Sequence, residues 1–457
     1  MVGRGSPVRQ ARHKLAQMAR FRHHVATRSS APTAPEPQIV IEHREELIYM
    51  ICEAAELEHS LMCEYLFAAF SLKRGGADGL GPRESALVQR WRSVIVKVAS
   101  DEMLHLAITA NLLSALGASP HLSRPNLPQP AHHYPPGVTI ALLPFGERAL
   151  RHFLFLERPE GMGLEDAEGL AVVGEAAPVM GSEDRVPRPQ DFATVGHLYR
   201  SIEAGFVRLV EKMGEERLFV GPAAAQVTDE GFRWPALIAV TDLDSARTAI
   251  ETIVAQGEGP TGDWRHAHFG QFKTVLDEYL AARAADPGFE PARPVLPVGL
   301  RAGPDETERR ITDPVTASVS DLFNIAYEAL LLVLYRLLAR IDETDEESLI
   351  LADVAVGIMT EVMAPVASAL GDLPIGPEEP GATAGAPFEL FYEPDYLLPH
   401  HRAAWLLYGE RLQVAARLAR RLSESVPSLG EVADTLERLA QRLGTGGPAA
   451  APTQLGR

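Results

Sequence analysis

The amino-acid sequence predicts an all-α protein: a four-helix bundle with a long crossover insertion, followed by an additional C-terminal helical unit. Apolar residues recur every three or four positions through six or more long segments, which is the spacing of amphipathic helices. Acidic and histidine side chains fall inside the apolar stripes of four successive segments, where such bundles place metal ligands. A long proline-containing connection, residues 118–190, separates the second segment from the third, as expected when those two helices run parallel.

The composition limits the classes of protein to which the chain can belong. The chain has 457 residues, enough for two or three domains, and its formal net charge is −18. That charge argues against nucleic acid and anionic membranes as partners. No uninterrupted apolar run approaches the roughly 20 residues of a membrane-spanning helix, and no apolar signal segment follows the basic start. We therefore expect a cytoplasmic protein whose two cysteines, Cys52 and Cys63, are reduced.

The first predicted helix covers residues 45–72 and places one carboxylate inward. Glu58 lies four residues after Ala54 and four before Met62, within the apolar stripe. The same segment contains a Glu-x-x-His pair, Glu56 and His59, which faces the two cysteines instead. Glu58 is therefore the preferred inward carboxylate of this helix.

The second predicted helix, residues 91–116, contains the most informative motif of the chain. Glu102 and His105 form a Glu-x-x-His pair in the middle of an apolar stripe that includes Ile95 and Val98. A carboxylate buried there needs a partner charge, a proton or a metal ion. For such a motif taken alone, a hydrogen-bonded core pair is the commoner explanation, so the remaining helices decide between the core pair and a metal site.

The third predicted helix, residues 192–213, contributes Glu203. This glutamate lies on the helix whose apolar face includes Tyr199 and Phe206. We therefore expect Glu203 to point into the bundle.

The fourth predicted helix is interrupted. Its apolar face leads to Glu258, breaks at residues 257–262 and resumes at Arg265. In the resumed part His268 shares a face with large apolar residues, whereas His266 lies on a neighbouring face. His268 is therefore preferred over His266 as the inward histidine.

Together these helices supply four inward carboxylates and two inward histidines. A bundle that binds two metal ions needs one glutamate from each of two helices, and a glutamate with a histidine from each of the other two. Each candidate alone is a weak signal, but the whole set on four successive helices favours a metal site over a structural polar core. The predicted metal ligands are Glu58, Glu102, His105, Glu203, Glu258 and His268.

Several segments of the chain resemble one known family. The chain is similar to the ferritin-like proteins that include the iminophenyl-pyruvate dimer synthases of bisindole pathways. The resemblance covers about residues 45–282 and continues more weakly to about residue 422. It lies in residues 58–66, 101–105, 120–122 with 125–128, 133–138, 155–160 and 256–259.

The resemblance implies a ferritin-like site for two metal ions and a role in secondary metabolism, on an amino-acid-derived substrate. The chain departs from the family pattern in its fourth helix, because Arg265 stands where the pattern has its glutamate and Glu258 lies ten residues before His268. Glu258 or a water molecule would then complete the ligand shell. Asp101 is predicted to accept a hydrogen bond from the far-side nitrogen of a ligand histidine, His268 on the facing helix.

The composition also divides the chain into five parts. The crossover contains a strand-like run, residues 138–143, and is expected to cap the bundle and shape a substrate pocket, with a purely structural cover as the alternative. The C-terminal unit is expected to pack against the bundle or to form a homodimer surface. The parts are a disordered basic tail (1–37), the metal-binding bundle with its insertions (38–285), a proline-rich linker (286–305), the C-terminal helical unit (306–443) and a disordered tail (444–457).

The leading hypothesis is a non-haem di-iron oxidase or oxygenase that uses O2 to oxidise or couple a small amino-acid-derived substrate. The cofactor would be two iron ions, with manganese or a mixed pair as the alternative, and Glu58, Glu102 and Glu203 would be the catalytic carboxylates. Glu64 and Tyr65 are candidate proton or electron donors, although core packing is preferred for Tyr65. Two alternatives stay open: a ferroxidase or metal-binding ferritin-like protein without an organic substrate, and a metal-free helical scaffold.

Overall fold

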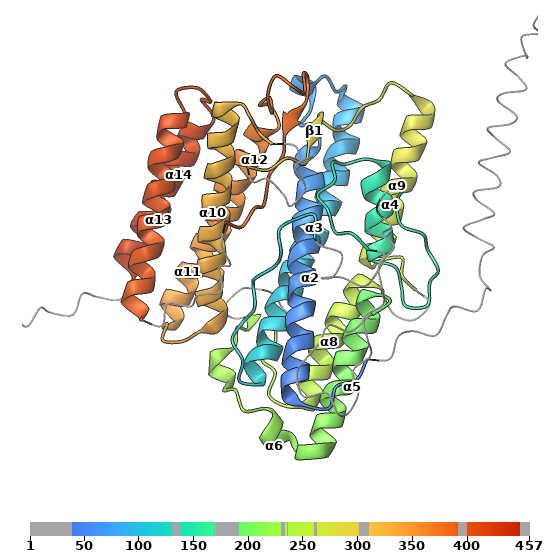
Figure 1. Cartoon of the computed structure of the whole chain (residues 1–457), viewed down its shortest axis with the longest axis vertical. Coiled ribbons are helices and arrows are strands. Elements are labelled where there is room, and N and C mark those ends of the chain that lie inside the picture. Colours follow the sequence, from blue (N-terminus) through green and yellow to red (C-terminus); the bar gives the residue numbers. More distant parts are fainter. Residues whose placement is uncertain are drawn as a thin grey trace, which may run out of the picture. The chain divides into compact units, whose positions relative to one another are not determined.

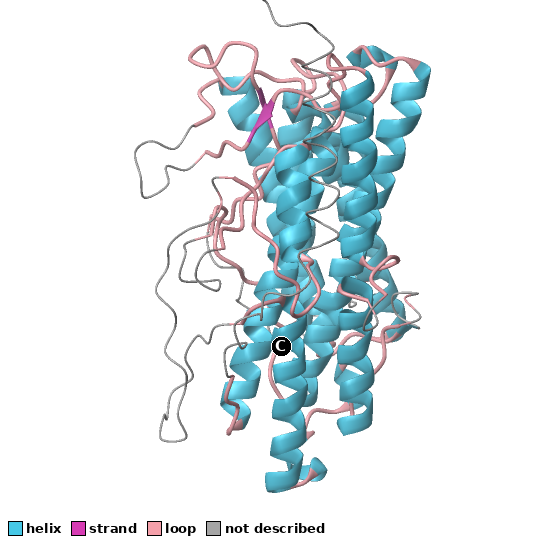
Figure 2. Ribbon diagram, turned by 90° about the vertical axis from the view of Figure 1, so that its right-hand side faces the viewer, coloured by secondary structure: helices cyan, strands magenta, loops and turns pink. Residues whose placement is uncertain are grey.

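The computed structural model describes residues 39–129, 138–168, 170, 192–229, 234, 236–259, 263–300, 310–391 and 400–447. Within these residues the regular structure is helical, apart from a short parallel pair formed by β1 (Val295–Leu296) and β2 (Thr383–Ala384) (Figure 2). The prediction of an all-α chain is therefore confirmed. The strand-like run at residues 138–143 is a loop, because its backbone forms no ladder with another strand among the described residues.

The two longest described helices, α2 (Arg44–Ser71) and α3 (Pro82–Ala115), lie against each other and form the centre of the first bundle (Figure 1). Most of α2 is buried, including almost every residue from Leu57 to Ala69. A helix buried on all sides must be covered on all sides by other elements. α3 begins earlier than predicted, because Pro82 suits a first helical turn and the Glu84 carboxylate accepts a hydrogen bond from the Gly81 N–H at 2.7 Å.

Each of the other two positions of the first bundle is filled by two shorter helices (Figure 1). One position holds α8 (Leu243–Gly257) followed by α9 (His268–Ala285), which both pack on α3 and are separated at the predicted break. The other holds α5 (Val195–Met213), which packs on α2 and α8, and α4 (Glu147–Leu156), which packs on α9. α4 comes from the crossover, so the crossover supplies part of the bundle itself.

Short elements complete the first bundle. After α2 comes a 3₁₀ turn, η1 (Gly76–Asp78). Between α5 and α8 lie α6 (Glu215–Leu218) and a second 3₁₀ turn, η2 (Ala223–Ala225). These turns connect the long helices and contribute no predicted ligand.

A second bundle follows the first. α10 (Pro314–Ala339) packs on α11 (Asp345–Gly357) and α13 (His401–Leu422), and α14 (Leu429–Gly446) packs on α11 and α13 as well. α11 continues through a π-helical turn, η3 (Ile358–Met363), into α12 (Ala364–Leu370). α14 extends past the predicted end of this unit at residue 443, which corrects the expectation of a disordered tail from residue 444. Its buried residues at positions 429, 432, 436, 439 and 443 explain why it forms a helix.

Two helices of the second bundle are long and apolar enough to cross a membrane by composition alone. Windows of 18 residues in α10 and in the continuous helix from Asp345 to Leu370 have mean hydropathy values of 1.6 and 1.8. Of these windows, 83% and 56% are buried inside the protein. Packing within the second bundle buries more than half of each window, so both are core helices of that bundle.

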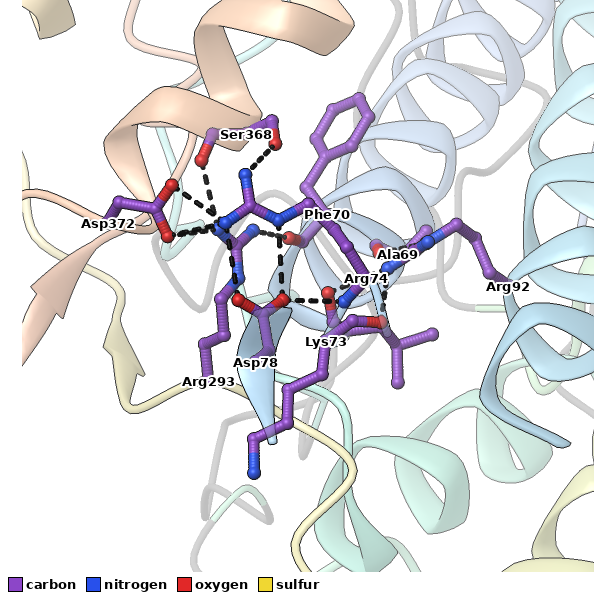
Figure 3. Close-up of polar contacts among 10 residues, drawn as sticks. Ala69, Phe70, Lys73, Arg74, Asp78, Arg92, Arg293, Ser368 and Asp372 are labelled. Atoms are coloured by element: carbon purple, nitrogen blue, oxygen red, sulfur yellow. Dashed lines mark hydrogen bonds and ion pairs between the residues drawn. The ribbon is translucent and has the colours of Figure 1, made fainter. Parts of the chain in front are cut away.

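Charged side chains join the second bundle to the end of α2 (Figure 3). An Arg74 Nη2 donates to both oxygens of Asp372 at 2.8 Å, and an Arg293 Nη1 donates to the Ser368 carbonyl at 2.9 Å. Nearby, α12 packs on α2, and α10 packs on α3. The C-terminal unit therefore packs against the first bundle, which is one of the two arrangements predicted; the homodimer surface stays a prediction.

Both bundles belong to one compact unit, which comprises Pro37–Glu160 and Leu164–Arg457. The predicted N-terminal tail and the last ten residues of the predicted C-terminal tail lie outside the described residues.

Candidate metal centre

Glu58 on α2 meets Glu102 and His105 on α3 in the interior of the first bundle. All three side chains are at most 2% exposed. His105 Nδ1 lies 2.8 Å from Glu102 Oε2 and 3.3 Å from Glu58 Oε2. One ligand-type atom from each residue lies within 4.8 Å of the other two. We call Glu58, Glu102 and His105 the first triad.

A second triad shares Glu102 and adds Glu157 and His268. Glu157 is the C-cap residue directly after α4, and His268 is the first residue of α9. His268 Nδ1 lies 3.0 Å from Glu102 Oε1 and 3.6 Å from Glu157 Oε2. Since Glu102 turns one oxygen to each triad, its carboxylate stands between two candidate ion positions.

The second triad contains two buried atoms that face each other without a hydrogen bond. Glu102 Oε1 and His268 Nδ1 are 3.0 Å apart, yet neither has a hydrogen-bond partner among the described residues. Buried polar atoms are almost always satisfied, and a shared cation would satisfy both of these. Three carboxylates with two imidazoles are a suitable ligand set for two ions of iron or manganese. The residues present therefore fit a two-metal site.

The charges of the ligands depend on one another because the group is buried. Burial raises the pKa of Glu58 to about 7, and the negative charge of Glu102 adds to this effect. Burial opposes protonation of His105, but Glu102 and Glu58 outweigh it and raise the pKa of this imidazole to about 10. The pKa of His268 is also raised well above its usual value, against the effect of burial, by Glu102 and Glu157. Protonated imidazoles thus balance the carboxylates, and bound metal ions would replace those protons.

Two tyrosines hold the outer carboxylates of the triads. Tyr199 Oη donates a hydrogen bond to Glu58 Oε1 at 2.6 Å, and Tyr65 Oη donates to Glu157 Oε1 at 2.5 Å. Burial, followed by the neighbouring carboxylate, raises the pKa of each phenol well above its usual value, so both stay protonated. Tyr65 therefore has a polar role beside Glu157, in addition to the core packing that the sequence favours.

Two further side chains orient the imidazoles. His268 Nε2 lies 3.3 Å from Asp101 Oδ2, which is the pairing that the sequence predicts. His105 Nε2 lies 3.0 Å from Gln256 Oε1, a partner that the sequence analysis did not identify. When the far nitrogen of each ring donates to such an oxygen, Nδ1 is left to bind a metal ion.

The structure does not bring Glu203 into the centre, which corrects its assignment as a ligand. Its side chain is 36% exposed, and Glu203 Oε1 lies 3.2 Å from Arg247 Nε. The buried stripe of α5 includes Tyr199, Ile202 and Phe206, and Glu203 lies at the flank of that stripe. Tyr199, one turn earlier, is the residue of α5 that reaches Glu58.

Glu258 is buried beside the triads, but its oxygens are used elsewhere. Oε1 accepts a hydrogen bond from the Gly196 N–H at 3.0 Å, and Oε2 accepts from the Glu160 N–H at 3.1 Å. Arg200 Nη2 lies 3.7 Å away. Glu258 therefore caps the N-terminus of α5 rather than completing a triad. Gly196 makes this possible, since a Cβ there would lie 2.1 Å from Glu258 Oε1.

The other candidates that the sequence raised lie outside the centre. Glu56 Oε1 is 2.8 Å from His121 Nε2. His59 donates through Nδ1 to a backbone carbonyl at 2.9 Å and accepts from the Tyr327 hydroxyl at 2.5 Å. His266 is exposed, because α9 begins only at residue 268 and not at 265 as assumed. Glu56 and His59, the Glu-x-x-His pair of α2, therefore make two separate structural contacts outside the triads.

Glu157 is the ligand candidate that the sequence analysis missed. It lies in the crossover, where no helix was predicted. A signal was nevertheless present, because Leu150, Phe153 and Glu157 follow one another at helical spacing, and the two apolar residues are buried. An acid that continues an apolar stripe is the same pattern that identified Glu58 and Glu102.

A small cavity, about large enough for one water molecule, adjoins the triads. It lies where the end of α4 and the start of α5 meet the end of α8. Glu58, Glu102, His105 and Glu157 form its polar wall, with Tyr199 and Glu258 beside them. The rest of its lining is mainly aliphatic: Leu61, Leu156, Val195, Ile253 and Val254. The first triad therefore faces a small, mainly aliphatic cavity on the side of α5 and α8.

A known family matches the part of the chain that holds both triads. A family model described as "Ferritin-like" matches residues 51–277, which include both triads. A solved ferritin-like protein from Caulobacter vibrioides covers 64% of this chain and 86% of that chain, at 18% identity and a TM-score of 0.39.

Two curated relatives are enzymes by name. Dichlorochromopyrrolate synthase of Lentzea aerocolonigenes is 27% identical over 96% of this chain and 45% of its own length. A 2-imino-3-(indol-3-yl)propanoate dimerase of Chromobacterium violaceum is 26% identical over 76% of this chain and 34% of its own length. The chain thus spans less than half the length of the curated relatives it matches.

Proposed function

Because the chain belongs to the ferritin-like family through residues 51–277, we propose that it is a cytoplasmic non-haem di-iron enzyme that uses O2 on a small amino-acid-derived substrate in natural-product biosynthesis. The observation on which the proposal depends is the pair of buried triads that share Glu102 at the wall of a cavity. Strongly perturbed ionisable groups beside an apolar cavity are typical of an active site.

The two triads would divide the metal ions between them. Glu58 and His105 would hold one ion, Glu157 and His268 the other, and Glu102 would contribute to both. Two bound iron ions would supply the electrons that reduce O2. Manganese or a mixed iron–manganese pair suits the same oxygen and nitrogen ligands.

The other residues would control orientation, protons and water. Gln256 and Asp101 hold the imidazoles with Nδ1 toward the ion positions. Tyr199 stays protonated and donates its hydroxyl proton to Glu58 at the cavity wall, which would hold that carboxylate in place. The aliphatic wall excludes water from this side of the centre.

The names of the relatives support an indole-derived imino acid as the substrate class. One relative is named as a dimerase of 2-imino-3-(indol-3-yl)propanoate, and the other as dichlorochromopyrrolate synthase. Leu61, Val195 and Ile253 give the cavity beside the first triad an aliphatic lining. We therefore propose oxidation of such an imino acid, with oxidative coupling of two molecules as the preferred outcome.

Anaerobic loading of the full chain with Fe(II), followed by mixing with O2, tests this function. We expect close to two irons per chain, one for each triad. Adding 2-imino-3-(indol-3-yl)propanoate should accelerate O2 uptake, and mass spectrometry should detect a coupled or oxygenated product. Well-folded protein that binds far less than one iron or manganese would overturn the metal centre. Iron retained far beyond two per chain, with no organic substrate consumed, would favour the ferroxidase alternative.

A further inference from the structure

A second buried group of ionisable residues lies outside the triads, where α4 meets α2. His152 on α4 stands between two carboxylates: its Nδ1 is 2.7 Å from Asp166 Oδ1, and its Nε2 is 3.4 Å from Glu64 Oε1. None of the three side chains is more than 2% exposed. We call Glu64, His152 and Asp166 the docking cluster.

The docking cluster ties several segments together at one point. Glu64 comes from α2, His152 from α4, and Asp166 from the chain that follows α4. Glu64 Oε1 also accepts a hydrogen bond from the Ala141 N–H at 2.5 Å, in the chain that precedes α4. Burial opposes a charge on His152, but Glu64 and Asp166 outweigh it and raise the pKa of the imidazole to about 9. A protonated imidazole donates to Asp166 through Nδ1, while its Nε2 faces Glu64 as an ion pair without a hydrogen bond.

α4 depends on such contacts because it is short. It has ten residues, and isolated helices of that length are marginal in water. Two adjacent residues of α2 contact it: Glu64 reaches His152, and Tyr65 donates to Glu157. His152 and Glu157 are only five residues apart in the chain. The contact between Glu64 and His152 therefore holds the helix that places Glu157 beside Tyr65.

From this geometry we propose that Glu64, His152 and Asp166 are positioning residues, which dock α4 on α2 so that Glu157 completes the second triad. The inference rests on the proposed function, because it assumes that the triads bind metal. It also gives the crossover a defined task. The crossover delivers a ligand from outside the four predicted helices, and the docking cluster holds that ligand at the centre.

The proposal predicts that the two triads can be separated. The first triad takes every ligand from α2 and α3, neither of which needs α4 for its own continuity. Removing the docking cluster should therefore spare the first ion and release the second. His152→Leu, which removes the hydrogen bond to Asp166 and the ion pair with Glu64, should reduce iron from two per chain to one after anaerobic Fe(II) loading of the full chain. Glu157→Gln, which removes the ligand directly, should give the same result.

A second measurement separates docking from a general loss of stability. Amide hydrogen exchange in residues 147–156 should become at least tenfold faster in His152→Leu, while exchange in α3 stays unchanged. Asn111→Ala is the matched control. Asn111 is also fully buried and holds the backbone at Val227 and Ile238, far along the chain from α4. This variant should lose thermal stability and still bind two irons.

The outcomes distinguish this inference from the proposed function. If the unaltered chain binds no metal, the proposed function fails first. If the unaltered chain binds two irons and His152→Leu also binds two, the docking proposal is wrong. Loss of both irons in folded His152→Leu would overturn it as well, since the cluster would then support the whole centre. Should His152→Leu not fold, Asp166→Asn, which keeps the size of the side chain, should weaken the second iron at least tenfold and leave the first unchanged.

Discussion

The two triads share a carboxylate but are built from different kinds of structure. The first uses α2 and α3, two uninterrupted helices, so the helical period alone sets the faces of its ligands. The second uses Glu157 and His268, which lie where α4 ends and α9 begins. The position of a ligand at a helix end depends on the residue at which the helix begins or ends, and on the contacts that hold that end in place. Half of the centre therefore depends on local structure, and half on contacts between distant segments.

The largest expected effect comes from the residue that both triads use. Glu102→Ala should abolish binding of both irons. Each triad loses the Glu102 oxygen that faces it, and the remaining ligands of the other triad cannot replace that oxygen. Alanine favours helix, so circular dichroism should show that α3 persists. Iron analysis after anaerobic loading measures the effect. Two irons retained by this variant would show that the triads are not the metal centre.

The histidines should divide the effect between the triads. His105→Ala and His268→Ala should each bind one iron, and the double variant none, because each imidazole serves one ion position. Electron paramagnetic resonance of bound Mn(II) should lose the signature of coupled ions in either single variant. His266→Ala is the control and should keep both ions, since this side chain is exposed. The reverse result for positions 266 and 268 would mean that the start of α9 is wrongly placed.

The residues that orient the imidazoles should have smaller effects. Asp101→Asn should weaken one iron site by about 10–100-fold without removing it, the usual range for a partner of a ligand histidine. Gln256→Leu should do the same for the other site. Titration calorimetry with Mn(II) under anaerobic conditions resolves the two affinities. Equal weakening of both sites by either variant would contradict the separation of the triads.

The docking cluster, which supports only the second triad, should make the thermal stability of the protein depend on pH. The pKa of His152 is raised from 6.5 to about 9 in the folded protein, against burial and chiefly by Glu64. Its stabilising contribution is therefore complete below pH 6.5 and is lost as the pH rises through 9. The difference in Tm between the metal-free unaltered chain and His152→Leu should shrink by more than half between pH 6.5 and pH 10. A constant difference would indicate that His152 is not protonated in the folded state.

The smallest effect is expected at Glu203. Glu203→Ala removes only a partly exposed ion pair with Arg247, which contributes about 0–1 kcal/mol. The variant should bind two irons and unfold within a few degrees of the unaltered chain. Loss of an iron here would mean that α5 turns a different face to the bundle.

Much of the fold could be predicted from helical periodicity. The bundle helices, the break before His268 and the long crossover all follow from patterns that extend over many residues. Two helices were missed for different reasons. α4 is short and lies between proline-containing loops, and α14 ends in a glycine-containing segment that resembles a tail in composition. In both cases a regular apolar stripe was present, but neighbouring residues obscured it.

The sequence by itself determined the helices and the inward positions of Glu58, Glu102 and His105. In a long helix, many apolar residues together define the buried face, so one ambiguous residue does not change the assignment. Only the tertiary structure decided that Glu157 and not Glu203 joins the centre. On α5 the apolar face is broad, and the contact with α2 selects Tyr199 within it. Likewise the N-terminus of α5 captures Glu258, and Glu64 and Tyr65 hold α4 at the centre. These choices depend on groups that lie far apart in the sequence, and no local pattern records which of them will meet.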